Sequence, residues 1–554
     1  MTRSVIDPIT RIEGHLRAEM EVEDGVVVDA WVSGGCFRGM ELVVENRTPE
    51  DAAQIVQRIC GVCPVSHAHA STIAAERSYG IEISNNARII RNLMEGAQFL
   101  HSHILWFYNL AALDYVNPIN ALEADVDTAI ELARAAGTSM NSDFGALKER
   151  LSKFASNGQL SIFSGNWFDA EGGEGYTLPP ELDLICTAHY LEALKMQARA
   201  SEINGLLGGK MPHVMTLIPG GTAFVPTDQK LDDLKYLVDE VYEWVSSTML
   251  QDTLAIAPYY TDALTWGGGV GRYIAWGVFE SQGSYSDFGE KMKNRYMPAG
   301  VLDDKLNLSD VEESKITEYM GHSWYKGSET MQSPYFVTEP DFTSYDVDDR
   351  YSWIKCPAYD GKPHEAGPLS RVLVAYKRGN TEIKKYVDDL LEALGAPGNI
   401  AAVQSTLGRV AARNIEAVYL AGLMKEWVDE LIEAVKGGDS EYFRSPETIT
   451  GEGTGFWEAP RGALYHSEKV VNGKIEGYQI IIPTTWNAAP HNEKGEPGPM
   501  EQALIGLPVG DIEKPINALR TVHSFDPCTA CAVHVSEPKT GKSFETVTNP
   551  WGVK

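Results

Sequence analysis

The sequence lacks any long hydrophobic run, because no stretch approaches the roughly 18 consecutive apolar residues typical of a membrane span. The first ten residues, MTRSVIDPIT, also lack the basic and apolar regions of a signal peptide. The sequence therefore predicts no direct membrane span. If the chain leaves the cytoplasm, another component must carry it.

Basic residues and cysteines are both scarce. There are 47 Lys and Arg residues against 77 Asp and Glu residues, for a net charge of −30, which argues against binding to nucleic acid. Seven cysteines form no disulfide framework, and we interpret Cys36, Cys186 and Cys356 as buried thiols that behave as small apolar residues. A hydrophobic content of 43% permits a sizeable core.

The remaining four cysteines form two Cys-x-x-Cys pairs at opposite ends of the chain. Cys60 and Cys63 lie in RICGVCPVSH, and Cys528 and Cys531 lie in DPCTACAVH. Both sulfurs of such a pair can turn to one side of a tight loop and bind a metal. The pairs of a zinc ribbon lie close in sequence, so these pairs predict a buried site that forms only where the two ends of the fold meet.

Apolar periodicity and capping residues predict a mainly helical chain. A hairpin is expected over 16–22 and 26–32, and residues 265–375 form an irregular layer with short strands. Residues 453–487 are expected to be loop and strands. Helices are predicted at 49–59, 64–79, 86–116, 122–136, 145–155, 181–207, 228–256, 382–395, 400–436 and 512–523. The fold class is α+β and predominantly helical: a central bundle of long helices with small peripheral β-sheets, in which residues 1–534 form a single interlocked unit.

Six short motifs point to a known family. RIEGH, RGME, RICGVC, APRGAL, PTTWN and DPCTACAVH occur in this order between Asp7 and His534, and together they resemble the large, catalytic subunit of nickel–iron hydrogenases. The resemblance implies reversible heterolytic cleavage of dihydrogen into protons and electrons.

By this resemblance the four paired cysteines hold nickel. Cys60 and Cys528 bind nickel alone, while Cys63 and Cys531 also bridge to an iron that carries carbonyl and cyanide ligands. Soft thiolates suit a redox-active late transition metal. A zinc ion bound by four thiolates is the alternative.

Further motif residues would surround this centre. Glu13 in RIEGH corresponds to the proton-transfer glutamate and is expected near Cys528. Arg461 in APRG would lie over the metals and pair with Asp526. Ser102 stands where many relatives have an acidic residue and cannot pair as a carboxylate would, so this arginine is expected to be held by Asp526 alone. Pro460 and Thr484 are expected to line the diatomic ligands. His67 is expected to donate a hydrogen bond to a bridging cysteine sulfur.

A second ion site is implied by RGME and by the last motif. Glu41 and His534 resemble ligands of a magnesium-like ion, with a backbone carbonyl near Ile480 and waters completing the shell.

The resemblance also carries expectations about partners. An iron–sulfur small subunit is expected to form a heterodimer or a higher assembly with this chain and to carry electrons away. A dedicated maturation protease is expected to remove residues 535–554 after His534. Export or membrane association through the partner is favoured over the cytoplasm. The alternatives are a hydrogen-sensing (regulatory) module and the quinone-site subunit of respiratory complex I, which lacks these cysteine pairs.

Overall fold

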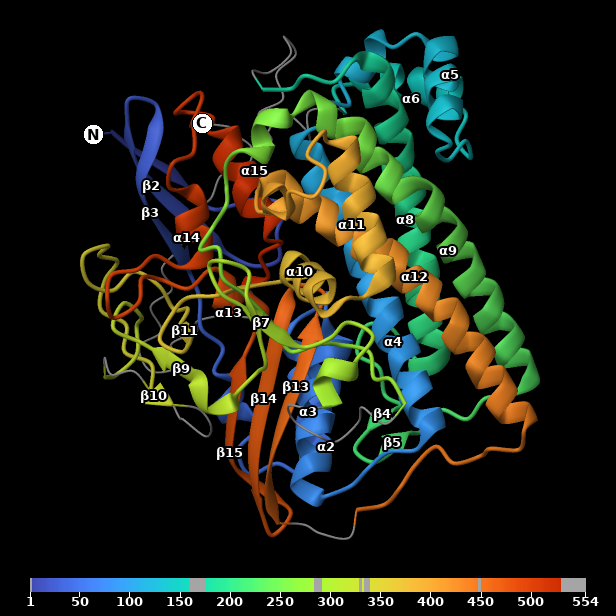
Figure 1. Cartoon of the computed structure of the whole chain (residues 1–554), viewed down its shortest axis with the longest axis vertical. Helices are drawn as coiled ribbons and strands as arrows, with labels where there is room; N and C mark the ends of the chain where they lie inside the picture. Colours follow the sequence, from blue (N-terminus) through green and yellow to red (C-terminus); the bar gives the residue numbers. More distant parts are fainter. Residues whose placement is uncertain are drawn as a thin grey trace.

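Four long helices form the largest layer of the molecule (Figure 1). The computed structural model describes residues 2–159, 175–282, 291–327, 331–332, 339–446 and 450–529. The four helices pack side by side and are α4 (Asn85–Ile104), α8 (Pro180–Gly208), α9 (Asp228–Ile256) and α12 (Thr406–Lys436). The predicted bundle of long helices is confirmed.

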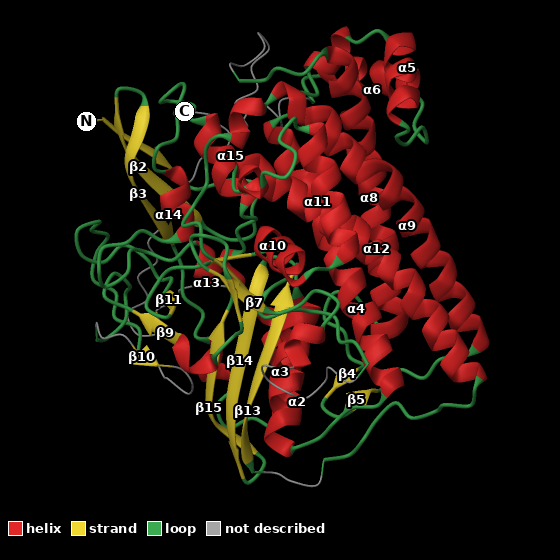
Figure 2. Ribbon diagram, in the orientation of Figure 1, coloured by secondary structure: helices red, strands yellow, loops and turns green. Residues whose placement is uncertain are grey.

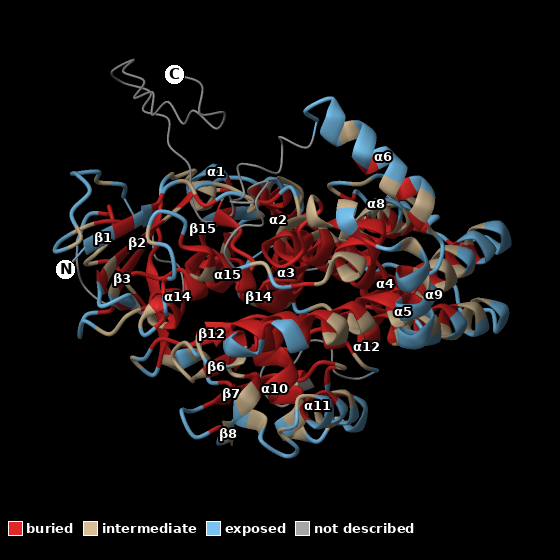
Figure 3. Ribbon diagram, turned by 90° about the horizontal axis from the view of Figure 1, so that it is seen from above, coloured by how far each residue is buried: buried red, intermediate tan, exposed pale blue. Residues whose placement is uncertain are grey.

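The other helices are shorter and surround this bundle and the sheets. They are α1 (Met40–Val43), α2 (Pro49–Ile55), α3 (Pro64–Tyr79), α5 (Val126–Ala136), α6 (Phe144–Ser156), α10 (Pro368–Arg378), α11 (Thr381–Ala393), α13 (Pro483–Asn487), α14 (Pro499–Leu504) and α15 (Ile516–Ser524). Helices α5 and α6 lie at one exposed corner, whereas α3 and α4 are almost entirely buried (Figure 3). None of the helices in the described ranges has the length and apolar character of a membrane span.

The strands form small sheets beside the bundle (Figure 2). Two antiparallel three-stranded sheets have the longest strands: β1 (Thr2–Ile6), β2 (Leu16–Glu23) and β3 (Val26–Gly34); and β13 (Gly451–Ala459), β14 (Gly462–Val471) and β15 (Lys474–Ile481). The others are short: β4 (Leu217–Ile218), β5 (Gly221–Thr222), β6 (Tyr273–Ala275), β7 (Gly300–Leu302), β8 (Leu308–Ser309), β9 (Ile316–Tyr319), β10 (Met331–Gln332), β11 (Cys356–Tyr359) and β12 (Glu365–Ala366). The small peripheral sheets and the irregular layer are thus as predicted.

Several details of the predicted helices were wrong, including the starts of α5 and α15, which begin at Val126 and Ile516 rather than near residues 122 and 512. Helix α12 begins at Thr406 rather than near residue 400, because Ser405 provides the side-chain cap that accepts from the backbone N–H of Gly408. Helix α10 begins at Pro368, inside the stretch expected to be irregular. The expected helix over 86–116 changes its hydrogen bonding at Leu105–Ala111, which forms a π-helix.

Strand β13 lies directly against helix α3, and this contact depends on glycine. Gly451, Gly453 and Gly455 alternate along the strand, so they share the face toward the helix. A Cβ at Gly455 would lie 1.8 Å from the carbonyl oxygen of Ala70. Because these glycines have no side chains, β13 can pack closely against α3, the helix whose N-cap is Cys63.

The two ends of the described chain meet beside the N-terminal sheet. Strands β2 and β3 share a hydrophobic core with α14 and α15. The backbone N–H of Val27 donates to the carbonyl of Leu507 at 3.0 Å, and Gly506 donates to Val27 at 2.8 Å. This packing brings the segment after α15 next to the first 60 residues.

Candidate metal centre

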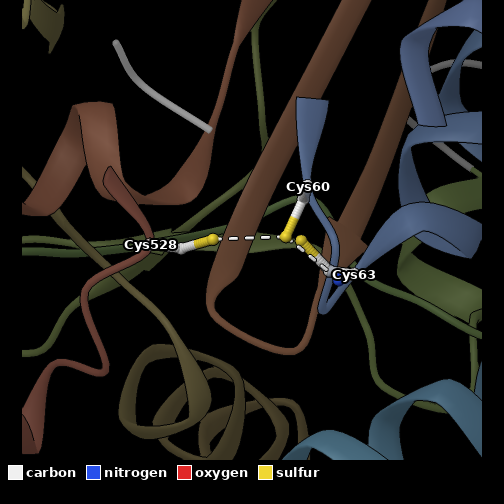
Figure 4. Close-up of side chains that lie close together, drawn as sticks. All are labelled: Cys60, Cys63 and Cys528. Atoms are coloured by element: carbon white, nitrogen blue, oxygen red, sulfur yellow. Dashed lines mark hydrogen bonds between the residues drawn. The ribbon is translucent and has the colours of Figure 1, made fainter. Parts of the chain in front are cut away.

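Three cysteine sulfurs gather in the interior of the molecule. The Sγ atoms of Cys60, Cys63 and Cys528 all lie within 4.8 Å of one another, and all three residues are buried (Figure 4). The Cys60 and Cys528 sulfurs are 3.2 Å apart. The predicted meeting of the two cysteine pairs is therefore observed for three of the four residues, and Cys531 lies outside the described residues. A compact group of buried, soft donors fits a thiophilic metal.

The local fold around the first pair favours thiolates. Cys60 follows a 3₁₀ turn that ends at Ile59, and Cys63 is the N-cap of α3, where the helix dipole stabilises negative charge. The backbone N–H groups of Val62 and Cys63 lie 3.3 and 3.0 Å from the Cys60 sulfur. These donors favour an anionic sulfur at Cys60.

Cys528 is held by contacts to two distant segments. Its backbone N–H donates to Thr484 Oγ1 at 3.0 Å. Glu13 forms a parallel bridge with Cys528, and its carbonyl accepts from the N–H of Thr529 at 2.7 Å. The Glu13 Oε2 atom lies 3.3 Å from the Cys528 sulfur, so the expected glutamate is within proton-transfer distance of that sulfur.

A buried cluster fixes the chain that leads to Glu13. His523 Nε2 lies 2.7 Å from the carbonyl oxygen of Thr10, and its Nδ1 lies 2.7 Å from Asp114. Arg11 also pairs with Asp114 at 2.5 Å. Burial would raise the pKa of Asp114, but Arg11 and His523 lower that pKa to about 2. This anion therefore ties α15 to the loop that carries Glu13.

Arg461 lies among the sulfurs and Asp526. Its Nη2 is 3.0 Å from Asp526 Oδ1, and its Nη1 is 3.3 Å from the Ser102 hydroxyl. The expectation that Asp526 alone would hold this guanidinium was incomplete, since Ser102 takes its second arm. Burial would lower the pKa of Arg461, but Asp526 and the three cysteines raise it well above its usual value. Arg461 is thus a permanent cation beside the thiols.

A network of buried charges continues from Asp526, and sequence reasoning missed it. Arg413 Nη1 lies 3.1 Å from Asp526 Oδ2 and 3.1 Å from His103 Nδ1. His103 Nε2 lies 2.9 Å from Glu416, which Arg371 binds through two nitrogens at 2.5 and 2.7 Å. We call these five residues the ionic network. Arg413 and Glu416 lie three positions apart in the mostly apolar first half of α12, and this spacing was the available sequence signal.

The three other residues expected beside the centre occupy defined positions. The carbonyl of Pro460 accepts from Arg371 Nη2 at 2.8 Å, and Thr484 contacts Cys528 as described. His67 lies one turn after Cys63 on α3 and is buried. Burial lowers the pKa of His67 to about 4, although Cys60 acts to raise that pKa. Its Nδ1 lies 3.2 Å from His466 Nε2, and its Nε2 has no hydrogen-bond partner among the described residues.

Two of the three residues expected to hold a second ion, Glu41 and Ile480, lie in contact. The backbone N–H of Ile480 donates to Glu41 Oε1 at 3.0 Å, and both residues line a cavity of about 70 Å³. Lys355 and Glu318 line the same cavity, with the Lys355 amine 3.6 Å from Glu41 and 3.8 Å from Glu318. His534 lies outside the described residues.

Comparisons with known proteins cover nearly the whole chain. The family described as nickel-dependent hydrogenase matches residues 38–534. The hydrogenase-2 large chain of Escherichia coli K12 is 39% identical over 559 residues, covering 96% of this chain and 97% of the relative. The uptake hydrogenase large subunit of Bradyrhizobium diazoefficiens is 38% identical, covering 97% and 96%. The structure of a [NiFeSe] hydrogenase variant from Desulfovibrio vulgaris Hildenborough matches with a TM-score of 0.80 and 35% identity, covering 96% of this chain and 99% of that one.

Proposed function

The chain belongs to the nickel-dependent hydrogenase family, and from this premise we propose that it cleaves dihydrogen reversibly at a nickel–iron centre whose iron carries carbonyl and cyanide ligands. The observation that supports this most strongly is the buried group of Cys60, Cys63 and Cys528, drawn from opposite ends of the chain. When bound, the metals supply the Lewis acidity that makes dihydrogen acidic enough to split, and they take up its electrons.

The cysteines divide into two classes in this proposal. Cys60 and Cys528 would hold nickel, and Cys63 and Cys531 would hold both nickel and iron. Arg461 presents guanidinium N–H groups over the centre, where a planar and permanently charged fork can donate to a cyanide nitrogen. The surroundings of the diatomic ligands are completed by Pro460 and Thr484. The ion pair of Arg461 with Asp526 keeps the guanidinium in place.

Glu13 acts as the proton carrier. Cleavage of dihydrogen releases a proton that needs a nearby base, and the Glu13 carboxylate lies 3.3 Å from the Cys528 sulfur. The proton passes from that sulfur to Glu13 and then outward. The backbone bridge between Glu13 and Cys528 keeps donor and acceptor at this distance.

A magnesium-like ion is proposed beside this centre, with Glu41, the Ile480 carbonyl and His534 as ligands and waters in the remaining positions. The cavity beside Glu41 and the oxygen donors around it support this proposal. The Lys355 ammonium balances the negative charge of Glu41 and Glu318.

Electrons leave through a separate iron–sulfur small subunit in this proposal. Among the described residues, the only group of three or more His, Cys, Asp or Glu side chains close enough to share a metal is the cysteine site itself. The relatives carry the names large chain and large subunit, which accords with a smaller partner. We also propose that the partner brings the chain to an exported or membrane-attached location, and that a maturation protease cuts after His534, where the family match ends.

The alternative function is a hydrogen-sensing module. It would use the same ligands, but the relatives reported above carry the names of hydrogenase and uptake hydrogenase chains. Turnover with a redox dye separates the two functions, since a sensor would bind the metals and turn over slowly.

The proposal is tested on the complex purified from its natural host. We expect nickel with an excess of iron, because the iron–sulfur clusters of the small subunit add to the iron of the centre. We also expect infrared bands of iron-bound carbonyl and cyanide, and a polypeptide that ends at His534 by intact-mass spectrometry. The Glu13→Gln variant should keep the metals and the bands but lose turnover by about 10²–10⁴-fold. Zinc in place of nickel, without such bands, would overturn the proposal, and active protein ending at Lys554 would overturn the cleavage.

A further inference from the structure

The loop that carries Glu13 runs beside the end of α15 and the segment that follows this helix. His523 Nε2 lies 2.7 Å from the carbonyl oxygen of Thr10, on the N-terminal side of Glu13. On the other side, the backbone N–H of Thr529 donates to the Glu13 carbonyl at 2.7 Å, next to the parallel bridge of Glu13 with Cys528. The Glu13 carboxylate, 3.3 Å from the Cys528 sulfur, therefore belongs to a loop that is tied on both sides.

The backbone of this loop needs support at Arg11, between Thr10 and Glu13. Arg11 has a φ of 53°, in the left-handed region that a residue with a long side chain rarely adopts. Such a conformation persists only where the surrounding structure fixes it. The largely buried guanidinium of Arg11 donates to the Leu110 carbonyl and pairs with Asp114 Oδ1 at 2.5 Å.

Asp114 also holds His523, and both ring nitrogens of this histidine face acceptors. Burial would raise the pKa of Asp114, but Arg11 and His523 lower it to about 2, so Asp114 is a carboxylate. Nδ1 of His523 lies 2.7 Å from Asp114 Oδ2, and Nε2 faces the Thr10 carbonyl. Two such hydrogen bonds require a proton on each nitrogen, so the ring is an imidazolium in this arrangement. We call Arg11, Asp114 and His523 the Asp114 cluster.

The Asp114 cluster connects the two partners of the proton transfer. Its single anion holds one cation from the loop of Glu13 and another from the helix that leads to Cys528. In the transfer the S–H bond of Cys528 breaks, an O–H bond forms on Glu13, and the sulfur keeps the electron pair. The rate depends steeply on geometry, because a displacement of about 1 Å can cost on the order of 10²-fold.

We propose that the three residues of the Asp114 cluster are positioning residues that keep the Glu13 carboxylate within proton-transfer distance of the Cys528 sulfur. This rests on the proposed function, in which Glu13 is the proton carrier. The cluster touches neither the carboxylate nor the sulfur in the contacts described above. It acts through the backbone of the two segments that carry them.

A second cluster of the same design lies in the helix bundle and provides a matched control. His189 Nδ1 lies 2.8 Å from Asp252 Oδ2, and its Nε2 lies 3.1 Å from the carbonyl oxygen of Ser139. Burial would lower the pKa of His189, but Asp252 raises it to about 9, so this ring is also an imidazolium at neutral pH. These hydrogen bonds join α8 and α9 to the segment between α5 and α6, and not to the loop of Glu13.

The substitutions Asp114→Asn and Asp252→Asn in the complete complex test the inference. Each removes a buried charge from an equivalent cluster, so both should lower the midpoint of thermal unfolding. We expect Asp114→Asn to lower turnover per bound nickel by roughly 10- to 10²-fold and to raise the solvent isotope effect in heavy water, because proton transfer becomes the slow step. Asp252→Asn should keep both values of the unmodified enzyme. The carbonyl and cyanide bands should be unchanged in both variants.

The two histidines provide a second matched pair. The single amide nitrogen of glutamine cannot replace two ring nitrogens that face different acceptors. We therefore expect His523→Gln to change turnover per nickel and the isotope effect in the same direction as Asp114→Asn, and His189→Gln to change neither. Crystal structures of Asp114→Asn and His523→Gln add a measurement that does not need the metals: the distance from Glu13 Oε2 to the Cys528 sulfur should exceed 3.3 Å.

The inference is overturned if Asp114→Asn and His523→Gln keep the turnover per nickel and the isotope effect of the unmodified enzyme, or if Asp252→Asn changes them as much. If neither cluster variant binds nickel, an unchanged distance from Glu13 to Cys528 in their crystal structures overturns it. If the unmodified complex lacks the carbonyl and cyanide bands, the proposed function fails, while the crystal structures still show whether the cluster holds Glu13. The two failures are therefore distinguishable.

Discussion

Glu416 on α12 and Glu468 on β14 are both fully buried glutamates with opposite ionisation. Burial would raise the pKa of Glu416, but Arg371 and His103 lower that pKa to about 2. Burial raises the pKa of Glu468 to about 8, and the nearby Glu50 contributes in the same direction. Partners, and not depth in the fold, therefore decide which buried carboxyl carries charge.

The same contrast separates two histidines near the cysteines. His103 lies between a guanidinium and a carboxylate, so its proton has one possible position. His466 lies between an imidazole and a phenol, each of which can donate or accept. On the side of the centre near α12, charged partners thus fix the position of the histidine proton. On the side near α3, the histidines contact only neutral hydrogen-bonding groups. Each side should respond differently when it is disturbed.

The largest effect is expected from Glu416→Gln. Removal of this charge takes away the two-armed partner of the buried Arg371 and leaves it with Glu458 at 2.7 Å, so the cost in the free energy of unfolding should lie near the lower end of the roughly 3–5 kcal/mol for breaking a buried pair. Thermal unfolding of the purified complex measures the loss. Glu441→Gln is the control, since its pair with Arg444 is exposed and should contribute about 1 kcal/mol or less. Equal losses in the two variants would show that burial of the pair does not matter.

Glu468→Gln should have a smaller effect that depends on pH. The pKa of Glu468 is higher in the folded state than its usual value of 4.5, so its contribution to stability is fully present below pH 4.5 and is lost as the pH rises through about 8. Glutamine does not ionise. The variant should therefore gain stability relative to the unmodified protein as the pH rises from 5 to 8, by on the order of a few kcal/mol.

The pH dependence of Glu416 should have the opposite sign. Its pKa is lowered in the folded state, so its contribution is present above pH 4.5 and is lost as the pH falls through about 2. Unfolding midpoints of the unmodified protein and of both glutamine variants are measured between about pH 2 and pH 8. The difference between each variant and the unmodified protein, plotted against pH, gives one slope for Glu416 and one for Glu468. Parallel slopes would contradict the assignment of charge to one side of the centre.

The smallest effect is expected from Ser102→Ala. The Ser102 hydroxyl is a neutral partner of Arg461 at 3.3 Å, while Asp526 provides the ionic contact. A hydrogen bond with one charged partner contributes about 1.5–3 kcal/mol, and the length of this contact places it at the low end of that range, which corresponds to a decrease in turnover of about tenfold. Turnover per bound nickel measures the effect. A loss as large as that of Asp526→Ala would show that the hydroxyl holds Arg461 as strongly as the carboxylate does.

The comparison also shows how far local sequence could predict this site. Helix α3 was predicted over its observed extent, because Pro64 marks its start and apolar residues continue to Tyr79. The nearness of Glu13 to Cys528 followed from motifs that resemble a known family. The ionic network was missed, because its members come from α4, α10, α12 and the loop after α15, and only Arg413 and Glu416 lie close together in the sequence. Cys531 and His534 stay predictions, since both lie outside the described residues.

The sequence by itself determined the donor set: soft thiols in two tight loops, a helix N-terminus behind Cys63, and a mainly helical fold with a large core. These follow from residue type and from short-range geometry, which act within a few positions of the chain. Only the tertiary structure decided the ionisation of each buried group. The pKa and the proton position of Glu416, Glu468, His103 and His466 depend on neighbours that are 12 (478 − 466) to 418 (468 − 50) positions away in the sequence and meet only on packing.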